Sequence, residues 1–364
     1  MIKEKQFHKL PSLDGWRAVS IAGVLLEHST ITTGFPIVLK PAIFIWLQPG
    51  NLGVRFFFVI SGFLITYLLL QEQAKHGFIS LNNFYFRRAL RILPVYFLYL
   101  GVLGFFTKYS QNATAWLANL TFTTNFLTIP HPTDHLWSLG VEEQFYLLWP
   151  WLLVMVSNGQ NDRSKLLKML FVPLMVAPVV RMLDCKQWYP EALHFLFQGG
   201  SFFARFDSLS YGCLTAVLFI NWRDPVETFF RRHSSQIAWA GVALILAPVG
   251  LRLLHLPGSL EALGFESMQA IGFSLLLLQS MLYPKRGFYR FLNWKWVSHI
   301  GILSYSIYIW QQMFCGTSES VFGVKEAWWV SFPVWILVAL MAAHASYYLL
   351  EKPLLALRSR LRPT

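Results

Sequence analysis

Charged side chains are scarce in this sequence, because only 13% of its 364 residues are Asp, Glu, Lys or Arg. A soluble globular domain usually carries about 25% charged residues, so the composition argues against a soluble protein. Cysteine is also scarce. Cys185, Cys213 and Cys315 show neither a CxxC motif nor a metal-binding spacing, which argues against a disulfide scaffold, and we expect no metal.

Apolar and aromatic residues are abundant instead. Hydrophobic residues make up 55% of the chain and aromatic residues 17%, as in membrane proteins with aromatic belts at both interfaces. The net charge of +12 would suit a nucleic-acid-binding protein, but the basic residues lie between apolar runs rather than along one soluble face. We therefore predict a protein embedded in membrane lipid, with no nucleic-acid partner.

Long apolar runs recur along the whole chain. A transmembrane helix needs about 20 mostly apolar residues. We predict an all-α, polytopic transmembrane bundle of about ten helices, forming a single membrane-embedded domain over residues 1–364. The first run follows basic residues but no small-residue cleavage site, so we interpret it as a retained span. The predicted spans are residues 17–35, 52–70, 89–107, 136–156, 166–183, 206–221, 236–254, 267–283, 297–315 and 329–350.

The distribution of basic residues predicts the orientation. With ten spans, most of the 30 lysines and arginines fall on one side of the membrane, Lys3, Lys5 and Lys9 among them. Loops rich in Lys and Arg usually lie in the cytoplasm. We therefore expect both termini there (N-in, C-in), which requires an even number of spans.

Polar residues within the first span form a first candidate site. A charged side chain in the membrane costs about 2.5–3.5 kcal/mol, so it usually faces a cavity or a partner. Arg17 and His28 are eleven residues apart, about 16 Å along a helix, which places Arg17 near the cytoplasmic face and His28 deeper. Histidine can act as a base near neutral pH. The alternative is a packed histidine bonded to a neighbouring helix.

A second candidate site spans residues 57–94. Ser61 and Gly62 lie in the second predicted span, where close helix packing by small residues is a better interpretation than nucleophilic catalysis by Ser61. Arg87, Arg88 and Arg91 lie at the entrance of the third span. They either clamp phosphate groups or serve only as topology signals.

A third candidate site enters the fourth span with Glu142, Glu143 and Gln144. Adjacent residues do not share a helix face. One carboxylate can therefore face a cavity while the other pairs elsewhere.

Together these clusters resemble the membrane-bound acyltransferase-3 family, over residues 13–357. The motifs that carry the resemblance occur in order along the chain. They are Leu13-Asp14-Gly15 with Arg17 and His28, Phe57–Phe63, Arg87–Pro94, Trp137–Tyr146, Arg205-Phe206-Asp207 with Gly212, Ser304–Trp310 and Glu351-Lys352-Pro353.

The resemblance implies an O-acyltransferase of the bacterial cytoplasmic (inner) membrane. The co-substrate would be acetyl-CoA or another acyl-CoA, and the acceptor a hydroxyl of a glycan or glycoside, such as lipopolysaccharide O-antigen. Some family members carry an extracytoplasmic SGNH-type domain, whereas this sequence ends shortly after the last predicted span. We expect transfer within the membrane domain, or onto a separate protein.

The resemblance also implies residue roles. We predict His28 as general base, oriented by Glu143. Many members have a histidine where this sequence has Gln311, which leaves His28 as the main titrating group. A covalent acyl relay on Ser61 or His28 is the competing mechanism. The predicted catalytic residues are His28, Glu143, Glu142 and Asp14; the cofactor-binding residues Arg17, Arg87, Arg88, Arg91 and Ser61; and the substrate-binding residues Trp137, Ser138, Arg205, Asp207 and Gln311.

Two other classes of protein share the membrane composition. A transporter or flippase also needs many spans and buried polar residues, but it often shows matched, broken helices in two repeats, and we find no such pair. A membrane sensor gives no reason for Arg17 and His28 on one helix.

Overall fold

In the computed structural model, every regular element of the described residues is a helix, which confirms the all-α class for this part of the chain. The structure describes residues 10–36, 47–107, 113–127, 132–157, 163–254, 257–315, 321–323 and 327–360. Lys3, Lys5 and Lys9, which contribute to the predicted orientation, lie outside these ranges.

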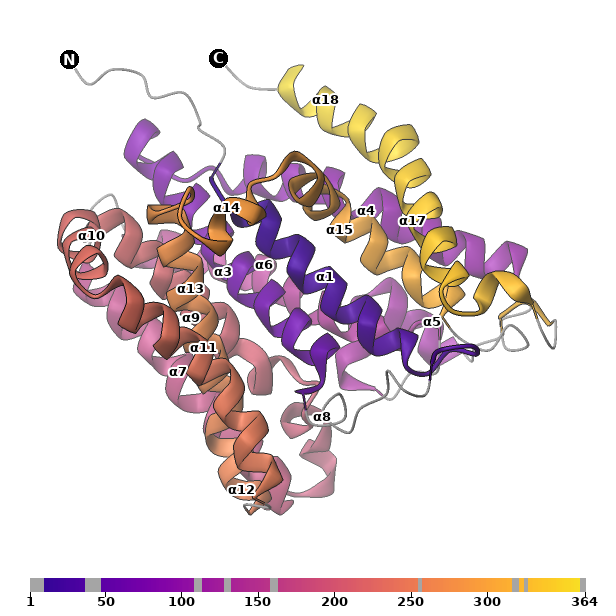
Figure 1. Ribbon diagram of the computed structural model, residues 1–364, viewed down its shortest axis with the longest axis horizontal. Helices are drawn as coiled ribbons and strands as arrows, with labels where there is room; N and C mark the ends of the chain where they lie inside the picture. The colour runs from indigo at the N-terminus through magenta and orange to yellow at the C-terminus, as the bar shows by residue number, and fades with distance from the viewer. Residues whose placement is uncertain are drawn as a thin grey trace.

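Long helices alternate with short helical segments along the chain (Figure 1). The long helices are α1 (Leu13–Ser29), α3 (Pro49–His76), α4 (Leu81–Phe106), α6 (Trp137–Ser157), α7 (Arg163–Lys186), α9 (Phe202–Asn221), α11 (Ser234–Leu253), α13 (Glu266–Leu282), α15 (Lys295–Phe314) and α17 (Val334–Ser346), which continues through η7 (Tyr347–Glu351) into α18 (Lys352–Arg360). The short elements are α5 (Ala113–Leu120), η2 (Thr124–Phe126), η3 (Asp134–Leu136), η4 (Glu191–Leu193), α8 (His194–Phe197), α10 (Arg223–Arg232), α12 (Gly258–Leu260), η5 (Glu261–Phe265), α14 (Phe288–Leu292) and η6 (Trp328–Val330).

Each of the ten predicted spans overlaps a long helix, but only seven helical stretches of the described residues are long and apolar enough to cross a membrane. The three long helices that fall short are α1, α6 and α15. The helix α1 has 17 residues and is slightly too short. The helices α6 and α15 are long enough, but they carry the Glu142–Glu143 pair and Gln311, which lower their hydropathy. The structure therefore supports a multi-pass helical protein, while the number ten and the orientation stay predictions.

The two ends of the bundle can be told apart. The start of α1 lies beside α14, because Ser12 N–H donates to Asn293 Oδ1 over 2.8 Å. Figure 1 shows α10 at this same end, and α8 and α12 at the opposite end. We call these the α14 end and the α12 end. Arg17 thus lies in the half of α1 nearer the α14 end, which is the predicted cytoplasmic end, and His28 lies toward the α12 end.

Glycines bring α3 into direct contact with its neighbours. A Cβ atom at Gly62 would overlap the carbonyl oxygen of Leu209 on α9, and one at Gly212 would overlap that of Val59 on α3. Gly53 of α3 lies in the same way against the backbone of Ser20 on α1. The predicted packing role is therefore confirmed for Gly62, whereas the neighbouring Ser61 faces elsewhere.

Candidate functional site

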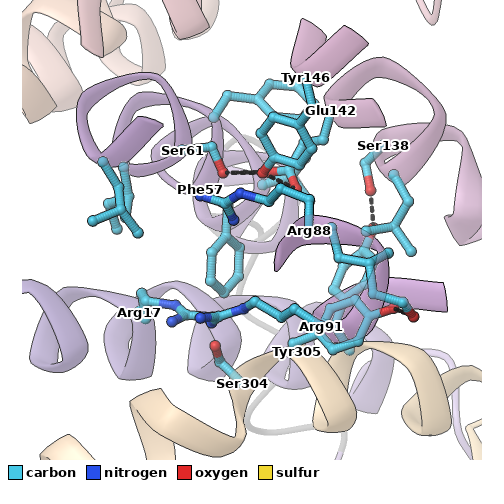
Figure 2. Close-up of a pocket in the computed structure, with 17 residues that line it drawn as sticks. Arg17, Phe57, Ser61, Arg88, Arg91, Ser138, Glu142, Tyr146, Ser304 and Tyr305 are labelled. Carbon is cyan, nitrogen blue, oxygen red and sulfur yellow. Dashed lines mark hydrogen bonds between the residues drawn. The ribbon is translucent and has the colours of Figure 1, made fainter. Parts of the chain in front are cut away.

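A pocket lies between α1, α3, α4, α6 and α15 (Figure 2). It encloses about 750 Å³ of space between protein atoms, part of which is open to solvent. All three helices that fall short as apolar spans contribute to it, so their polar residues have an interior to face. Its polar lining residues are Arg17, Ser61, Arg88, Arg91, Ser138, Glu142, Tyr146, Ser304, Tyr305 and Tyr308.

Three arginines of this pocket form no ion pair within the described part of the chain. Figure 2 shows Arg17 and Arg91 pointing toward one another, with Ser304 beside them. The Arg88 guanidinium lies 5.0 Å from the centre of the Tyr146 ring. Like charges that face each other inside a helical bundle repel strongly, because little water screens them. The pocket therefore favours an anion, and a multiply charged one above all.

A carboxylate and two hydroxyls form a hydrogen-bonded group at one wall. Ser61 Oγ donates to Glu142 Oε1 over 2.8 Å, and the Tyr146 hydroxyl donates to Glu142 Oε2 over 3.1 Å. Ser61 Oγ and the Tyr146 hydroxyl are themselves 3.0 Å apart. Glu142 is thus held by neutral donors rather than by a cation, which leaves the arginines available to a ligand.

Arg87 lies outside the pocket lining. Its guanidinium donates to the Glu72 carboxylate over 2.9 Å, linking the end of α3 to the start of α4. Arg88 and Arg91 are three residues apart and share a helix face, whereas adjacent residues point about 100° apart. The predicted phosphate-binding role therefore fits Arg88 and Arg91 but not Arg87.

His28 is half-buried and does not line the pocket. Its Nδ1 lies 2.6 Å from Gln311 Oε1 on α15. This is the bond to a neighbouring helix that the packing alternative predicts. The predicted pairing with Glu143 is wrong in this structure. Glu143 lies among Glu142 and Arg88 at the level of the pocket, on the side of α6 that Glu142 does not share.

Two predicted catalytic carboxylates lie outside the pocket lining. Asp14 is half-buried in the first turn of α1, where its backbone touches Gly301 of α15. Glu143 has one buried carboxylate oxygen without a hydrogen-bond partner in the described structure. Of the three predicted carboxylates, only Glu142 faces the pocket, and these placements do not support a catalytic contact by Asp14.

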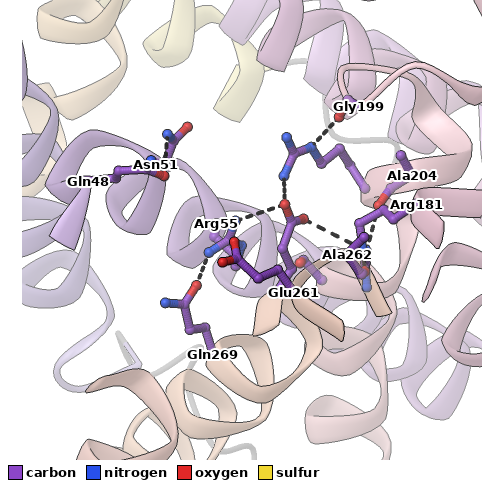
Figure 3. Close-up of polar contacts among 12 residues, drawn as sticks. Gln48, Asn51, Arg55, Arg181, Gly199, Ala204, Glu261, Ala262 and Gln269 are labelled. Carbon is purple, nitrogen blue, oxygen red and sulfur yellow. Dashed lines mark hydrogen bonds and ion pairs between the residues drawn. The ribbon is translucent and has the colours of Figure 1, made fainter. Parts of the chain in front are cut away.

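Asp207, a predicted substrate-binding residue, is fully buried in an ionic cluster that includes Arg181. Figure 3 shows Arg181 and Arg55 among the polar contacts of this region. Asp207 Oδ2 accepts hydrogen bonds from Arg181 over 2.9 Å and from Ser267 over 2.6 Å. This burial leaves no room for an acceptor, so the predicted substrate-binding role of Asp207 does not hold.

Arg205 belongs to the same cluster. It forms an ion pair with Glu266, which also binds Arg55 at 3.2 Å. The cluster therefore joins α3, α7, α9 and α13, and its arginines, unlike those of the pocket, all have carboxylate partners. The Arg205 guanidinium also lies 5.5 Å from the centre of the Trp137 ring, so the predicted acceptor contacts of both residues are replaced here by contacts within the protein.

Ser138 lines the pocket, with its Oγ 2.5 Å from the Tyr308 hydroxyl. This places Ser138 in the arginine pocket rather than at a separate acceptor site. Gln311 is fully buried and reaches His28 instead of a solvent-exposed surface.

The partners in the ionic cluster were missed by reading the sequence. Arg55 and Arg181 lie within the predicted spans 52–70 and 166–183, which is a usual sign of an internal partner. Their partner Glu266 gives no such sign, because it precedes its predicted span by one residue and lies far along the chain from both arginines. Sequence spacing alone cannot identify such a partner.

Comparison with known proteins gives a match over almost the whole chain. The family model described as an acyltransferase domain matches residues 10–351. The chain is 26% identical over 371 residues to the O-acetyltransferase OatA of Staphylococcus aureus (strain NCTC 8325 / PS 47), covering 95% of this chain and 57% of that protein. No solved structure gives a significant match.

A second relative is the peptidoglycan O-acetyltransferase OatA of Listeria monocytogenes (serovar 1/2a, strain ATCC BAA-679 / EGD-e). It is 26% identical over 324 residues, which cover 83% of this chain and 48% of that protein. The chain therefore spans about half the length of the curated relatives it matches.

Proposed function

The chain belongs to the acyltransferase-3 family, and on this premise we propose that it is an integral membrane O-acyltransferase. It moves an acyl group, acetyl above all, from cytoplasmic acyl-CoA to a hydroxyl of a cell-surface glycan. The observation that carries the proposal is a group of three arginines, Arg17, Arg88 and Arg91, that faces one pocket inside the helical bundle and forms no ion pair with the residues the structure describes.

Acyl-CoA has the chemistry that this pocket needs. Its nucleotide end carries several phosphate groups, and guanidinium groups bind phosphate through paired, charge-assisted hydrogen bonds. The pocket lies toward the predicted cytoplasmic end, where a soluble acyl-CoA is supplied. Ser61, Ser138 and Ser304 add hydroxyl groups to the same lining, which can hydrogen-bond the uncharged part of the donor.

His28 is our proposed general base. It lies eleven residues from Arg17 on α1, about 16 Å along the helix axis, so the donor must reach that far with its thioester end. His28 takes the proton of the acceptor hydroxyl, whose oxygen attacks the thioester carbon. The new C–O bond forms as the C–S bond breaks, and the thiolate of CoA leaves with the proton that His28 returns.

The acceptor enters from the opposite side in this scheme, toward the α12 end. Lipopolysaccharide O-antigen is our first example of such a glycan. Peptidoglycan is a second, which the name of the Listeria relative favours. Either acceptor places the protein in the bacterial cytoplasmic membrane, with glycan outside and acyl-CoA inside.

The test is transfer of labelled acetyl from acetyl-CoA to isolated glycan by the purified protein in detergent, with no ion gradient. We expect label on the glycan, and mass spectrometry to show the acetyl increment. His28→Ala should lower the rate by about 10²–10⁴-fold, the usual contribution of a general base, while membrane insertion is unchanged. Gradient-dependent movement of an unmodified glycan would instead indicate a transporter, and normal turnover by the variant would remove the role of His28.

A further inference from the structure

A chain of three hydrogen bonds connects His28 to an acidic residue in a different part of the sequence. His28 Nδ1 lies 2.6 Å from Gln311 Oε1, and Gln311 Nε2 donates to Gln312 Oε1 over 3.0 Å. Gln312 Nε2 then donates to Asp134 Oδ1 over 3.0 Å. Both glutamines are buried, whereas Asp134 lies in η3 and is exposed. An inner histidine is thereby linked to a solvated carboxylate.

The Asp134 carboxylate sets the donor-to-acceptor direction of all three hydrogen bonds. An ionised carboxylate only accepts hydrogen bonds, whereas each amide has a donor side and an acceptor side. Because Asp134 must accept, Gln312 presents its NH₂ group to it and its oxygen to Gln311. Gln311 in turn presents its NH₂ group to Gln312 and its oxygen to His28. The thiol of Cys315, 3.6 Å from Gln312 Oε1, is a further donor consistent with this direction.

The last bond of the chain fixes the proton on the imidazole. Gln311 Oε1 can only accept, so His28 Nδ1 must carry the hydrogen that joins them. In the neutral ring the other nitrogen, Nε2, then keeps its lone pair. A base needs this free lone pair, and opposite amide orientations would leave the proton on Nε2 and remove the basic nitrogen.

We propose that Gln311, Gln312 and Asp134 are positioning residues that hold His28 in the tautomer with Nε2 free to act as base. This inference rests on the proposed role of His28 in acyl transfer. A carboxylate orients a catalytic histidine directly in many enzymes, and here two amides transmit its direction across α15. Gln311 thus acts on the imidazole rather than on the acceptor.

The central test reverses the donor and acceptor roles along this series of hydrogen bonds. Asp134→Lys puts a donor-only group at its start, which reverses both amides and moves the imidazole proton to Nε2. We expect kcat to fall by about 100-fold, within the range for loss of a general base, with the KM for acyl-CoA unchanged. Glu191→Lys is the matched control, since it makes the same charge change at an exposed site of η4 and should leave kcat unaltered.

A second substitution tests whether these residues set the direction of the hydrogen bonds or only support the structure. In the double variant Asp134→Lys with Gln312→Glu, the new carboxylate accepts from both the introduced ammonium group and Gln311, so the original direction returns toward His28. We expect kcat to recover to within about tenfold of the parent. ¹⁵N spectra of histidine-labelled protein, with His28 assigned by its loss in His28→Ala, should show protonated Nδ1 in the parent and the double variant, and protonated Nε2 in Asp134→Lys.

The outcomes are separable. An unchanged tautomer in Asp134→Lys overturns the inference, and so does a loss of kcat that the second substitution fails to restore. If His28→Ala itself kept full turnover, the base role would fail, whereas the ¹⁵N spectra would still decide whether the chain directs the ring.

Discussion

At the scale of single residues, the buried arginines fall into two groups that differ in their partners. Arg55, Arg181 and Arg205 each meet a carboxylate inside the bundle. Removing one partner of such a buried pair leaves a charge without compensation, which is strongly destabilising. Arg17 and Arg91 meet no carboxylate in an ion pair within the described residues and face the pocket instead. The first group holds helices together, and the second is suited to an external anion.

Ser61 provides a residue-scale prediction about the two mechanisms. It shares the pocket with the arginines that we assign to the phosphate end of the donor, so the thioester of an extended donor lies away from it. We expect Ser61→Ala to raise the KM for acyl-CoA by a few-fold, since one hydrogen bond contributes about 0.5–1.5 kcal/mol. We also expect no acyl-serine after a denaturing quench with labelled acetyl-CoA. A labelled peptide containing Ser61 would contradict direct attack and support a covalent relay.

The sequence located more of the site's residues than of their contacts. Arg17, Arg88, Arg91, Ser61, Ser138 and Glu142 were predicted as site residues and converge on one pocket. Their partners could not be predicted, because a partner such as Gln311 for His28 depends on how distant helices pack. Asp207 was predicted as a site residue because it belongs to a family motif, but its carboxylate accepts a hydrogen bond from Arg181 inside the protein.

At the scale of elements, the short length of α1 and the polarity of α6 and α15 explain why only seven of the ten predicted spans are long and apolar enough to cross a membrane. These helices line the pocket, so their polar residues face the protein interior rather than lipid. The helical segments themselves were predictable from apolar runs. Backbone N–H and C=O groups in lipid have no water to bind, and a helix pairs them within one segment. Their contacts were less predictable, except where small residues such as Gly62 indicated close packing.

The contact between α3 and α9 can be tested through Gly62. In Gly62→Ala the added methyl group meets the backbone oxygen of Leu209, and a backbone atom cannot rotate away. We expect a loss of about 1–3 kcal/mol in stability, as for other overpacked cores, seen as a lower Tm in detergent. Gly101→Ala on α4 is the control, because its Cβ would meet no atom within 4 Å. Equal Tm values for the two variants would contradict the close contact.

At the scale of the whole molecule, the candidate site has two levels along the bundle. The arginine pocket lies toward the α14 end, where basic residues of α10 and α14 also lie. His28 and its hydrogen-bonded chain lie toward the α12 end, about 16 Å farther along α1. This separation suits a reaction whose donor comes from one side of the membrane and whose acceptor comes from the other, and it predicts that acyl-CoA is used only from the cytoplasm.

The most direct measurement is acetyl transfer from labelled acetyl-CoA in sealed vesicles of known orientation. We expect transfer to glycan in inverted vesicles, where the cytoplasmic face is outside, and none in right-side-out vesicles. In the inverted vesicles, Arg88→Gln combined with Arg91→Gln should raise the KM for acetyl-CoA by at least about tenfold, since each charged hydrogen bond contributes about 1.5–3 kcal/mol. Arg87→Gln, which removes a half-buried pair with Glu72 outside the pocket lining, should leave this KM unchanged. Equal transfer from both faces, or equal KM values for the two sets of variants, would contradict a cytoplasmic donor site at these arginines.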